Sequence, residues 1–342
     1  MPIDPTERRP IGRTGLTATC LGLGSASLGG MYRAVADDDA ISTIRHAWDL
    51  GVRFFDTAPL YGYGAAERRI GTTLRDRPRD AYVLSSKVGR LVFEPGTVPA
   101  GADVDPQVLD GRVDGVYADV GGRRIVFDYS ADGIRRSLEA SLERLGLDRI
   151  DIALIHDPDT HWEAAIGEAF PALARLREEG MIRAIGAGMN QAPMLARFAH
   201  EGDFDVFLCA SRYTILDHSA LDELIPACEA RGASILVGGV MNTGLLVDPK
   251  PGARYDYVEA PPEMIDRARR LAAVCERHGV PLRAAAVQFP LAHPVVASVV
   301  AGVRSIAHLD DYPALMRVPI PADLWAELRQ EGLIRPDAPT PA

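Results

Sequence analysis

Apolar runs bounded by turn residues recur along the chain, and amphipathic segments separate them. Eight short runs carry apolar side chains without strict alternation, at residues 20–25, 52–58, 81–88, 149–156, 182–188, 204–210, 233–239 and 296–302. That pattern is typical of parallel strands covered on both faces. Four segments repeat apolar residues at steps of three and four, as one helical face requires, at residues 37–51, 130–147, 163–180 and 262–279.

Strands that alternate with helices predict an α/β fold, a (β/α)8 TIM barrel. Such a barrel accounts for residues 1–342 as a single domain. An open, doubly wound sheet is the competing architecture. The glycine-rich stretch 22–30 does not favour that sheet, because no G-x-G-x-x-G motif opens a helix there.

Four segments lie outside this repeat. Residues 8–18 are expected to form an N-terminal hairpin that closes the floor of the barrel. The long connections 89–129 and 244–262 are expected to be active-site loops at the C-terminal face, because long loops are often functional. Residues 335–342 are expected to form a flexible tail.

Composition narrows the class of protein. The 342 residues are 47% hydrophobic and 25% charged, enough for a large core, and the formal net charge is −10. This negative charge argues against a nucleic-acid partner, since nucleic-acid binders carry basic faces. No apolar run is long enough for a membrane helix, and no signal peptide is evident. Four scattered cysteines without a C-x-x-C motif predict reduced thiols in a cytoplasmic protein, either a monomer or a homo-oligomer.

Four polar residues fall near the C-terminal ends of the predicted strands, where barrel enzymes gather their chemistry. Asp56 lies near the end of the second strand, Lys87 near the end of the third, and His156 ends the fourth. Tyr61 follows in the loop after Asp56. Each residue alone also fits a surface or structural role. In the barrel, however, all four converge on one face, where Asp56 and Lys87 can pair as buried charges must.

This set predicts proton transfer. A free tyrosine titrates near pH 10, and a nearby ammonium group lowers that pKa. Asp56 would orient Lys87, and Tyr61 would then exchange a proton with a substrate oxygen that His156 also binds. No covalent nucleophile is evident. A proton shuttle of this kind suits redox chemistry at a C–OH or C=O group, with a cofactor handling the hydride.

The motifs FFDTAPLYGYGAAE, SSKVG, LIHDPD and VAGVRSIAHLDD occur here in that order. They resemble the aldo-keto reductases, and the resemblance spans residues 10–318. It implies a (β/α)8 barrel and a nicotinamide cofactor that lies across the strand ends. It also implies a catalytic set of Asp56, Tyr61, Lys87 and His156, with no metal ion.

The cofactor residues of that family match less completely. Gly188 stands where the family has a serine, Ala210 where a glutamine is usual, and Gly238 where an aromatic ring stacks on the nicotinamide. The resemblance places cofactor contacts on Asn190, Gly238, Gly239, Val240, Met241, Asn242, Gly244, Gly302, Arg304, Ser305 and His308. Backbone amides of residues 240–244 would hold the pyrophosphate. NADP-preferring members often carry an arginine at the position of His308, so NAD is expected to be preferred over NADP.

Three further segments, FDYSADGIRRSLEASLERLGLDRIDIALIHDPD, GAGMNQ and RYTILD, resemble the sugar-oxidising branch of the family. This implies oxidation of the C1 hemiacetal hydroxyl of an aldose such as L-fucose to the lactone, with Tyr61 as the base. Met31, Tyr32 and Tyr129 are expected on the substrate side. Oxidation of pyridoxal to 4-pyridoxolactone and general NADPH-dependent reduction of aldehydes or ketones remain alternatives.

Two rival functions come from other classes. The segment HDPDTH, residues 156–161, packs two histidines and two aspartates into six positions and could bind a divalent metal. Asp157-Pro158 favours a turn instead, and a third strand-derived histidine is lacking. The second rival is a non-catalytic regulatory subunit that senses the cofactor, against which the complete catalytic set argues.

Overall fold

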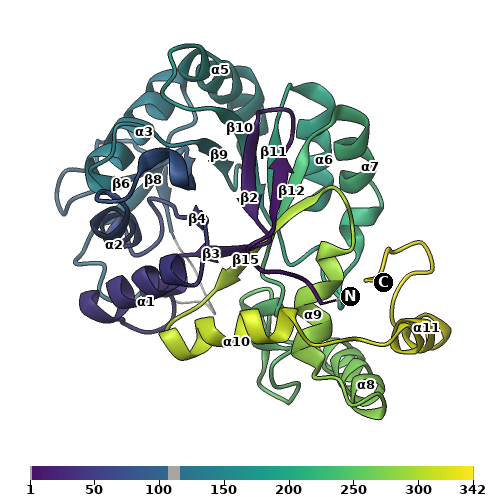
Figure 1. The fold of residues 1–342 in the computed structure, drawn as a ribbon. Coiled ribbons are helices and arrows are strands. Elements are labelled where there is room, and N and C mark those ends of the chain that lie inside the picture. Colours follow the sequence, from purple (N-terminus) through teal and green to yellow (C-terminus); the bar gives the residue numbers. More distant parts are fainter. Residues whose placement is uncertain (1, 107–115, 342) are drawn as a thin grey trace.

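The computed structural model describes residues 2–106 and 116–341. Eight parallel strands close into a barrel, in the order β10-β11-β12-β15-β3-β4-β5-β9 (Figure 1). All eight apolar runs of the sequence form these strands. Their bounds are β3 Leu21–Gly24, β4 Phe54–Asp56, β5 Val83–Val88, β9 Ile152–His156, β10 Ala184–Met189, β11 Val206–Ala210, β12 Ser234–Gly238 and β15 Val296–Gly302.

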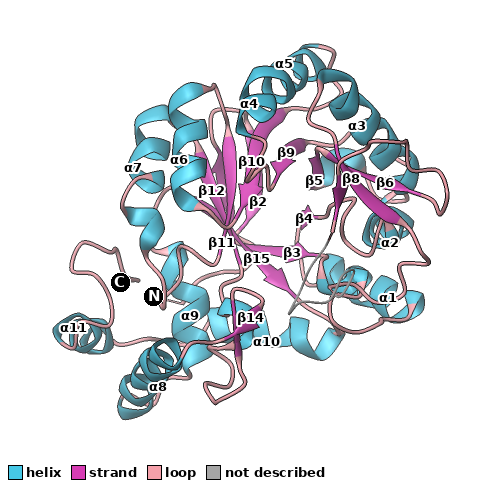
Figure 2. Cartoon of the chain, turned by 180° about the vertical axis from the view of Figure 1, so that it is seen from behind, coloured by secondary structure: helices cyan, strands magenta, loops and turns pink. Residues whose placement is uncertain are grey.

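Helices surround the strands on the outside of the barrel (Figure 2). They are α1 Asp37–Asp49, α2 Ala65–Leu74, α3 Ala131–Leu145, α4 Trp162–Ala164, α5 Phe170–Glu178, α6 Ala192–Glu201, α7 Leu224–Arg231, α8 Pro262–Arg277, α9 Leu282–Leu291, α10 Ile306–Met316 and α11 Ala322–Gln330. Helix α3 shows how the sequence sets such bounds. Ser130 caps its start by accepting a hydrogen bond from the amide of Gly133, and Gly146 ends it in the left-handed region, at φ 64°.

The floor of the barrel is closed by the N-terminal hairpin, as the sequence predicted. Strands β1 (Arg8–Ile11) and β2 (Leu16–Thr19) pair in antiparallel register. Ile11 and Leu16 join the apolar cluster inside the barrel. The amide of Gly12 donates to the hydroxyl of Ser234, the first residue of β12, so the hairpin lies at the N-terminal ends of the strands. The opposite end stays open for a site.

Both long connections contain strands of their own, where the sequence predicted only loops. The first carries β6 (Arg90–Phe93), β7 (Val104–Asp105) and β8 (Arg124–Phe127) as a three-stranded antiparallel sheet. Residues 107–115 of this predicted loop lie outside the described residues. The second connection forms a hairpin of β13 (Arg254–Tyr255) and β14 (Val258–Glu259). Its two turn residues, Asp256 and Tyr257, both have positive φ angles, as a tight hairpin turn requires.

The C-terminal segment, predicted to be a flexible tail, makes several contacts with helix α11. Ala338 is only 1% exposed, and the guanidinium of Arg329 donates to its carbonyl oxygen and to the hydroxyl of Thr340. These contacts place residues 338–340 against α11. The proline-rich sequence of this segment gave no indication of that packing. The four cysteines are buried and unpaired, as expected. In the described ranges, no helix is long and apolar enough to cross a membrane.

Candidate active site

An ion pair between two adjacent strands is the centre of the site. Asp56 is the last residue of β4, and Lys87 is the last residue but one of β5. The ammonium of Lys87 lies 2.8 Å and 3.0 Å from the two carboxylate oxygens of Asp56 and donates to the carbonyl oxygen of Thr57. Ser85 donates to the same carboxylate at 2.7 Å. Both charged side chains are almost fully buried, so each charge compensates the other away from water.

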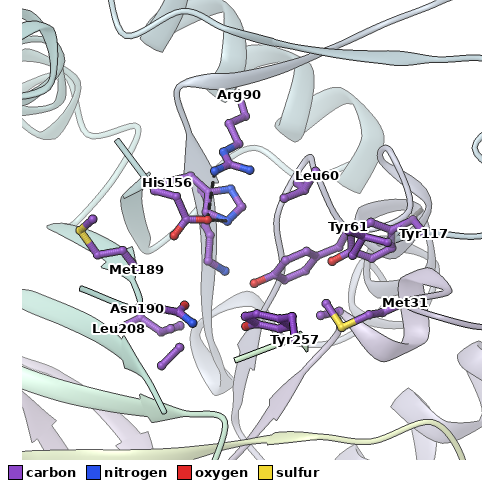
Figure 3. A pocket seen from close by; sticks show the side chains of 16 residues that line it. Met31, Leu60, Tyr61, Arg90, Tyr117, His156, Met189, Asn190, Leu208 and Tyr257 are labelled. Carbon is purple, nitrogen blue, oxygen red and sulfur yellow. Dashed lines mark hydrogen bonds and ion pairs between the residues drawn. The ribbon is translucent and has the colours of Figure 1, made fainter. Parts of the chain in front are cut away.

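Tyr61 and His156 meet beside this ion pair. The ammonium of Lys87 lies 4.6 Å from the centroid of the Tyr61 ring. The rings of Tyr61 and His156 are edge to face, with centroids 6.0 Å apart. In Figure 3 both side chains reach into the same space from opposite sides. The structure thus brings together all four residues that the sequence singled out.

The protonation states of these groups differ from the expectation at one point. The sequence predicted that Lys87 lowers the pKa of Tyr61. Burial instead raises the pKa of Tyr61 well above its ordinary value of 10, and the charge of Asp56 adds to the shift. Burial, together with the charges of Arg90 and Lys87, holds the pKa of His156 well below 6.5. At neutral pH the protein therefore offers a protonated phenol and a neutral imidazole.

One cavity of about 240 Å³ contains the site. Its lining combines the catalytic candidates Tyr61, Lys87 and His156 with apolar, aromatic and charged groups: Ala26, Met31, Leu60, Arg90, Val116, Tyr117, Asp157, Gly188, Met189, Asn190, Leu208, Ala210 and Tyr257. Apolar walls with a few convergent polar groups are typical of small-molecule sites.

Of the three predicted substrate residues, one lines the cavity and two do not. Met31 lines the cavity. Tyr32 does not, and the guanidinium of Arg254 lies over its ring, 5.2 Å from the centroid. Tyr129 is buried beside the cavity, and its hydroxyl donates to the backbone carbonyl of His156 at 2.5 Å. Tyr129 therefore supports the strand end and does not line this cavity.

Sequence reasoning missed two charged residues of the cavity wall. Arg90 begins β6, is 8% exposed and pairs with Asp105 and Asp157. Burial raises the pKa of the Asp157 carboxyl to about 6, although Arg90 opposes the shift. The signal for Asp157 was its position directly after His156. The signal for Arg90 was weaker, because it opens a segment that read as a loop.

The ends of β10 and β11 provide a flat wall that fits a planar ring. Gly188, Leu208 and Ala210 line it, and a Cβ atom at Gly188 would lie 3.5 Å from the side chain of Lys87. Asn190 adds a polar amide at the rim. Small side chains beside the ion pair and one amide group are suited to a nicotinamide and its carboxamide. Of the predicted cofactor residues, Asn190 alone lines this cavity.

The predicted pyrophosphate loop starts at the end of β12. Gly238 ends that strand, Gly239 is exposed with φ 64°, and Val240 is buried. The sequence predicted that backbone amides of residues 240–244 would face a pyrophosphate. The amide of Asn242 donates instead to the carbonyl of Gly239, and that of Gly244 to the carbonyl of Met241. These two amides are engaged within the turn in this conformation.

The predicted adenosine contacts lie around a second hollow of about 450 Å³. Arg304 and Ser305 line it together with Asp39 and other residues of the segment 34–43. Ser305 caps α10, where its hydroxyl accepts from the amide of His308, and Gly302 is exposed at the end of β15. Arg304 also donates to the carbonyl of Met31, which lines the first cavity. The two hollows therefore lie close to each other, as an extended dinucleotide would need.

The metal-binding rival gains no support from the geometry. His161 pairs with Asp103 at 2.8 Å. Within residues 2–106 and 116–341, no three histidine, cysteine, aspartate or glutamate side chains are placed to hold a metal ion together.

Fold and site define a (β/α)8 barrel with a titratable set around one cavity at its C-terminal face, where barrel enzymes hold their active sites. Residues 20–331 match the Aldo/keto reductase family. The D-threo-aldose 1-dehydrogenase of a Pseudomonas species is 43% identical over 331 residues, covering 96% of this chain and 97% of the relative. The pyridoxal 4-dehydrogenase of Microbacterium luteolum is 40% identical, covering 98% of this chain and 100% of the relative.

A solved structure agrees with these relatives. The aldo-keto reductase AKR11C1 from Bacillus halodurans, in its holo form, superposes with a TM-score of 0.71 at 25% identity, covering 95% of this chain and 96% of the other. The chain belongs to the aldo/keto reductase family. It is accordingly an NAD(P)-dependent oxidoreductase that acts on a small molecule.

Proposed function

We propose that this enzyme oxidises the C1 hemiacetal hydroxyl of an aldose such as L-fucose to the lactone, with NAD as the preferred cofactor. The observation that carries the proposal is the cavity itself, which holds a phenol, a buried ammonium and a neutral imidazole within one wall. The D-threo-aldose 1-dehydrogenase relative, similar over nearly the whole chain, supports the choice of substrate.

The proton path follows from the protonation states. Tyr61 exchanges the hydroxyl proton, and neutral His156 donates a hydrogen bond to the same substrate oxygen. The ammonium of Lys87 pairs with Asp56 and places positive potential beside the phenol ring. The nicotinamide, when bound, accepts the hydride from C1. Asn190 and the flat wall at Gly188 would hold its ring.

Preference for NAD rests on the second hollow. The guanidinium of Arg304 already donates to the carbonyl of Met31, and Asp39 lines the same hollow. The first turn of α1 is acidic, with Asp37, Asp38 and Asp39 in sequence. Of these three acids Asp39 lines the hollow, so a 2′-phosphate would meet its negative charge, whereas the 2′-hydroxyl of NAD would not.

Pyridoxal remains the second candidate because of the aromatic wall. Tyr61, Tyr117 and Tyr257 line the cavity, and rings of this kind pack well against a planar pyridine. The pyridoxal 4-dehydrogenase relative, at 40% identity, points the same way.

Absorbance at 340 nm decides between these substrates. Purified enzyme is mixed with NAD⁺ or NADP⁺ and with L-fucose, other aldoses or pyridoxal. Rapid NAD⁺ reduction with L-fucose is expected. NAD⁺ reduction with pyridoxal alone would make pyridoxal, and not an aldose, the substrate. If the enzyme only reduces aldehydes with NADPH, both the aldose and the pyridoxal proposals are rejected. Cofactor binding without turnover of any compound would favour the sensor function.

Tyr61→Phe tests the mechanism. The variant lacks the transferable proton, so turnover should be abolished while the affinity for NADH, measured by fluorescence, stays unchanged. Tyr63→Phe is the matched control, since Tyr63 is a buried phenol of the same loop that does not line the cavity. Wild-type kcat in Tyr61→Phe would refute the assignment of the proton donor.

A further inference from the structure

A buried guanidinium that neither gives nor takes a proton in the proposed path forms part of the cavity wall. Nη1 of Arg90 donates to Asp105 at 2.9 Å, and Nη2 donates to Oδ2 of Asp157 at 3.1 Å. Arg90 and Asp157 both line the cavity that holds Tyr61 and His156. In Figure 3, Arg90 reaches towards the cavity beside His156. The pair therefore faces the substrate space and does not only join β6 to the barrel.

The backbone holds Asp157 in an unfavourable conformation. Its φ angle is 40°, in the left-handed region that a non-glycine residue rarely adopts. Hydrogen bonds on both sides enforce it: the amide of Asp157 donates to the carbonyl of Gly188, and the hydroxyl of Tyr129 donates one proton shared between the carbonyls of His156, at 2.5 Å, and Asp157, at 3.2 Å. Strain of this kind persists where the surroundings over-determine a position, and such positions cluster at functional sites.

The result is a carboxylate placed next to the oxygen-binding imidazole. Oδ2 of Asp157 lies 3.5 Å from Nε2 of His156. The side chain is 27% exposed, and none of the described residues donates a hydrogen bond to its other oxygen, Oδ1. A carboxylate accepts hydrogen bonds only, and a guanidinium donates only, so together they can satisfy both the donor and the acceptor of one hydroxyl group.

An aldose carries such a hydroxyl on C2, one bond from the reacting C1. If His156 binds the C1 oxygen, a group 3.5 Å from its Nε2 is within reach of the neighbouring oxygen. We propose that Arg90 and Asp157 form a specificity subsite that binds the 2-hydroxyl group of the aldose. This inference rests on the proposed aldose oxidation and deepens it, because it assigns the residues that select a 2-hydroxy sugar.

The first test compares L-fucose with its 2-deoxy analogue in the wild-type enzyme. Hydrogen bonds to charged groups contribute about 1.5–3 kcal/mol, so kcat/KM should fall about 10- to 150-fold for the 2-deoxy sugar. Equal kcat/KM values would overturn the subsite while leaving aldose oxidation intact. No turnover of any aldose would overturn the proposed function, and the subsite with it.

The second test assigns the effect to Asp157. Asp157→Asn should lower kcat/KM for L-fucose about tenfold or more and leave the value for the 2-deoxy sugar within about twofold. The Kd for NADH should not change. Asp159→Asn, which neutralises an exposed acid of the same loop, is the matched control and should leave both sugars unaffected. Equal losses on the two sugars in Asp157→Asn would show that Asp157 only positions His156, and would overturn the subsite.

Discussion

The ion pair between Lys87 and Asp56 allows a quantitative test of how the site is built. Lys87→Met keeps the length and the apolar stem of the side chain and removes only its charge. Asp56, at 2% exposed, would then keep a buried carboxylate whose remaining side-chain partner is the hydroxyl of Ser85. That carboxylate ends a barrel strand beside the cavity that Lys87 lines, so water from the cavity would replace the lost ammonium only in part.

The expected loss of stability in Lys87→Met follows from the distance between the two charges. Two unit charges 2.8 Å apart attract by about 6 kcal/mol at an effective dielectric constant of 20. Desolvation of both ions offsets much of this attraction. When one partner is removed, the desolvation cost of the remaining buried ion is no longer compensated. Breaking a buried pair in this way typically costs about 3–5 kcal/mol. The hydrogen bond from Ser85 should keep Lys87→Met near the lower end of that range.

The assay is urea unfolding followed by tryptophan fluorescence, together with turnover. Lys87→Met should lose about 3 kcal/mol of stability and nearly all activity. The double variant with Asp56→Asn should recover much of the stability and none of the activity, because it removes the unpaired charge as well. The sequence contains one other lysine, Lys250, which is 65% exposed, so Lys250→Met serves as a control with no expected loss. A loss below about 1 kcal/mol for Lys87→Met would refute this account.

Further predictions follow from glycine packing and protonation. Gly186→Ala should lower the free energy of unfolding by about 1–3 kcal/mol, because its Cβ would lie 2.2 Å from the carbonyl oxygen of Val206. Gly188→Ser should keep wild-type stability, since a Cβ atom there meets only ordinary van der Waals contacts. Thermal unfolding of the two variants compares these outcomes. Oxidation should accelerate from neutral to alkaline pH until Tyr61 is ionised in the complex with the oxidised cofactor, because burial raises the pKa of Tyr61 and oxidation needs the phenolate; a rate independent of pH would contradict this. Below pH 6, where the raised pKa of Asp157 leads to its protonation, the enzyme should lose its selectivity for the 2-hydroxy sugar over the 2-deoxy sugar. The charges of Arg90, Lys87 and Asp159 also influence this pH dependence. Asp157→Asn should show no such pH dependence.

The barrel was readable from the sequence because burial on both faces leaves a simple signature. Each barrel strand is apolar on both sides, so it appears as a short continuous run with a turn signal at each end. The antiparallel insertions lack that signature. Strand β7 has two residues, and both β13 and β14 are partly or fully exposed, so no periodic pattern can develop. Their pairing depends on contacts with the barrel that the local sequence does not encode.

The catalytic candidates could be predicted from the sequence for a related reason. The other polar residues of the cavity wall could not. A charge that ends an apolar strand is unusual and points to a site, which identified Asp56, Lys87 and His156. Arg90 opens an irregular insertion, so its burial depends on how that insertion folds back over the barrel. Tyr257 lines the cavity from a hairpin turn, for the same reason. Residues placed by strands can therefore be predicted from order along the chain, whereas residues placed by insertions require the structure.

The raised pKa of Tyr61 changes how the ion pair serves the reaction. Lys87 faces the ring of Tyr61, and Asp56 cancels much of its charge at a distance of 2.8 Å, so the protein alone keeps the phenol protonated. A protonated phenol is ready to donate in the reducing direction. Oxidation needs the phenolate, and the positive charge that favours a phenolate must then come from outside the ion pair. The oxidised nicotinamide is a cation and the reduced form is neutral at that ring. The proton affinity of Tyr61 should therefore be lower in the complex with the oxidised cofactor, which suits one phenol to both directions of the reaction.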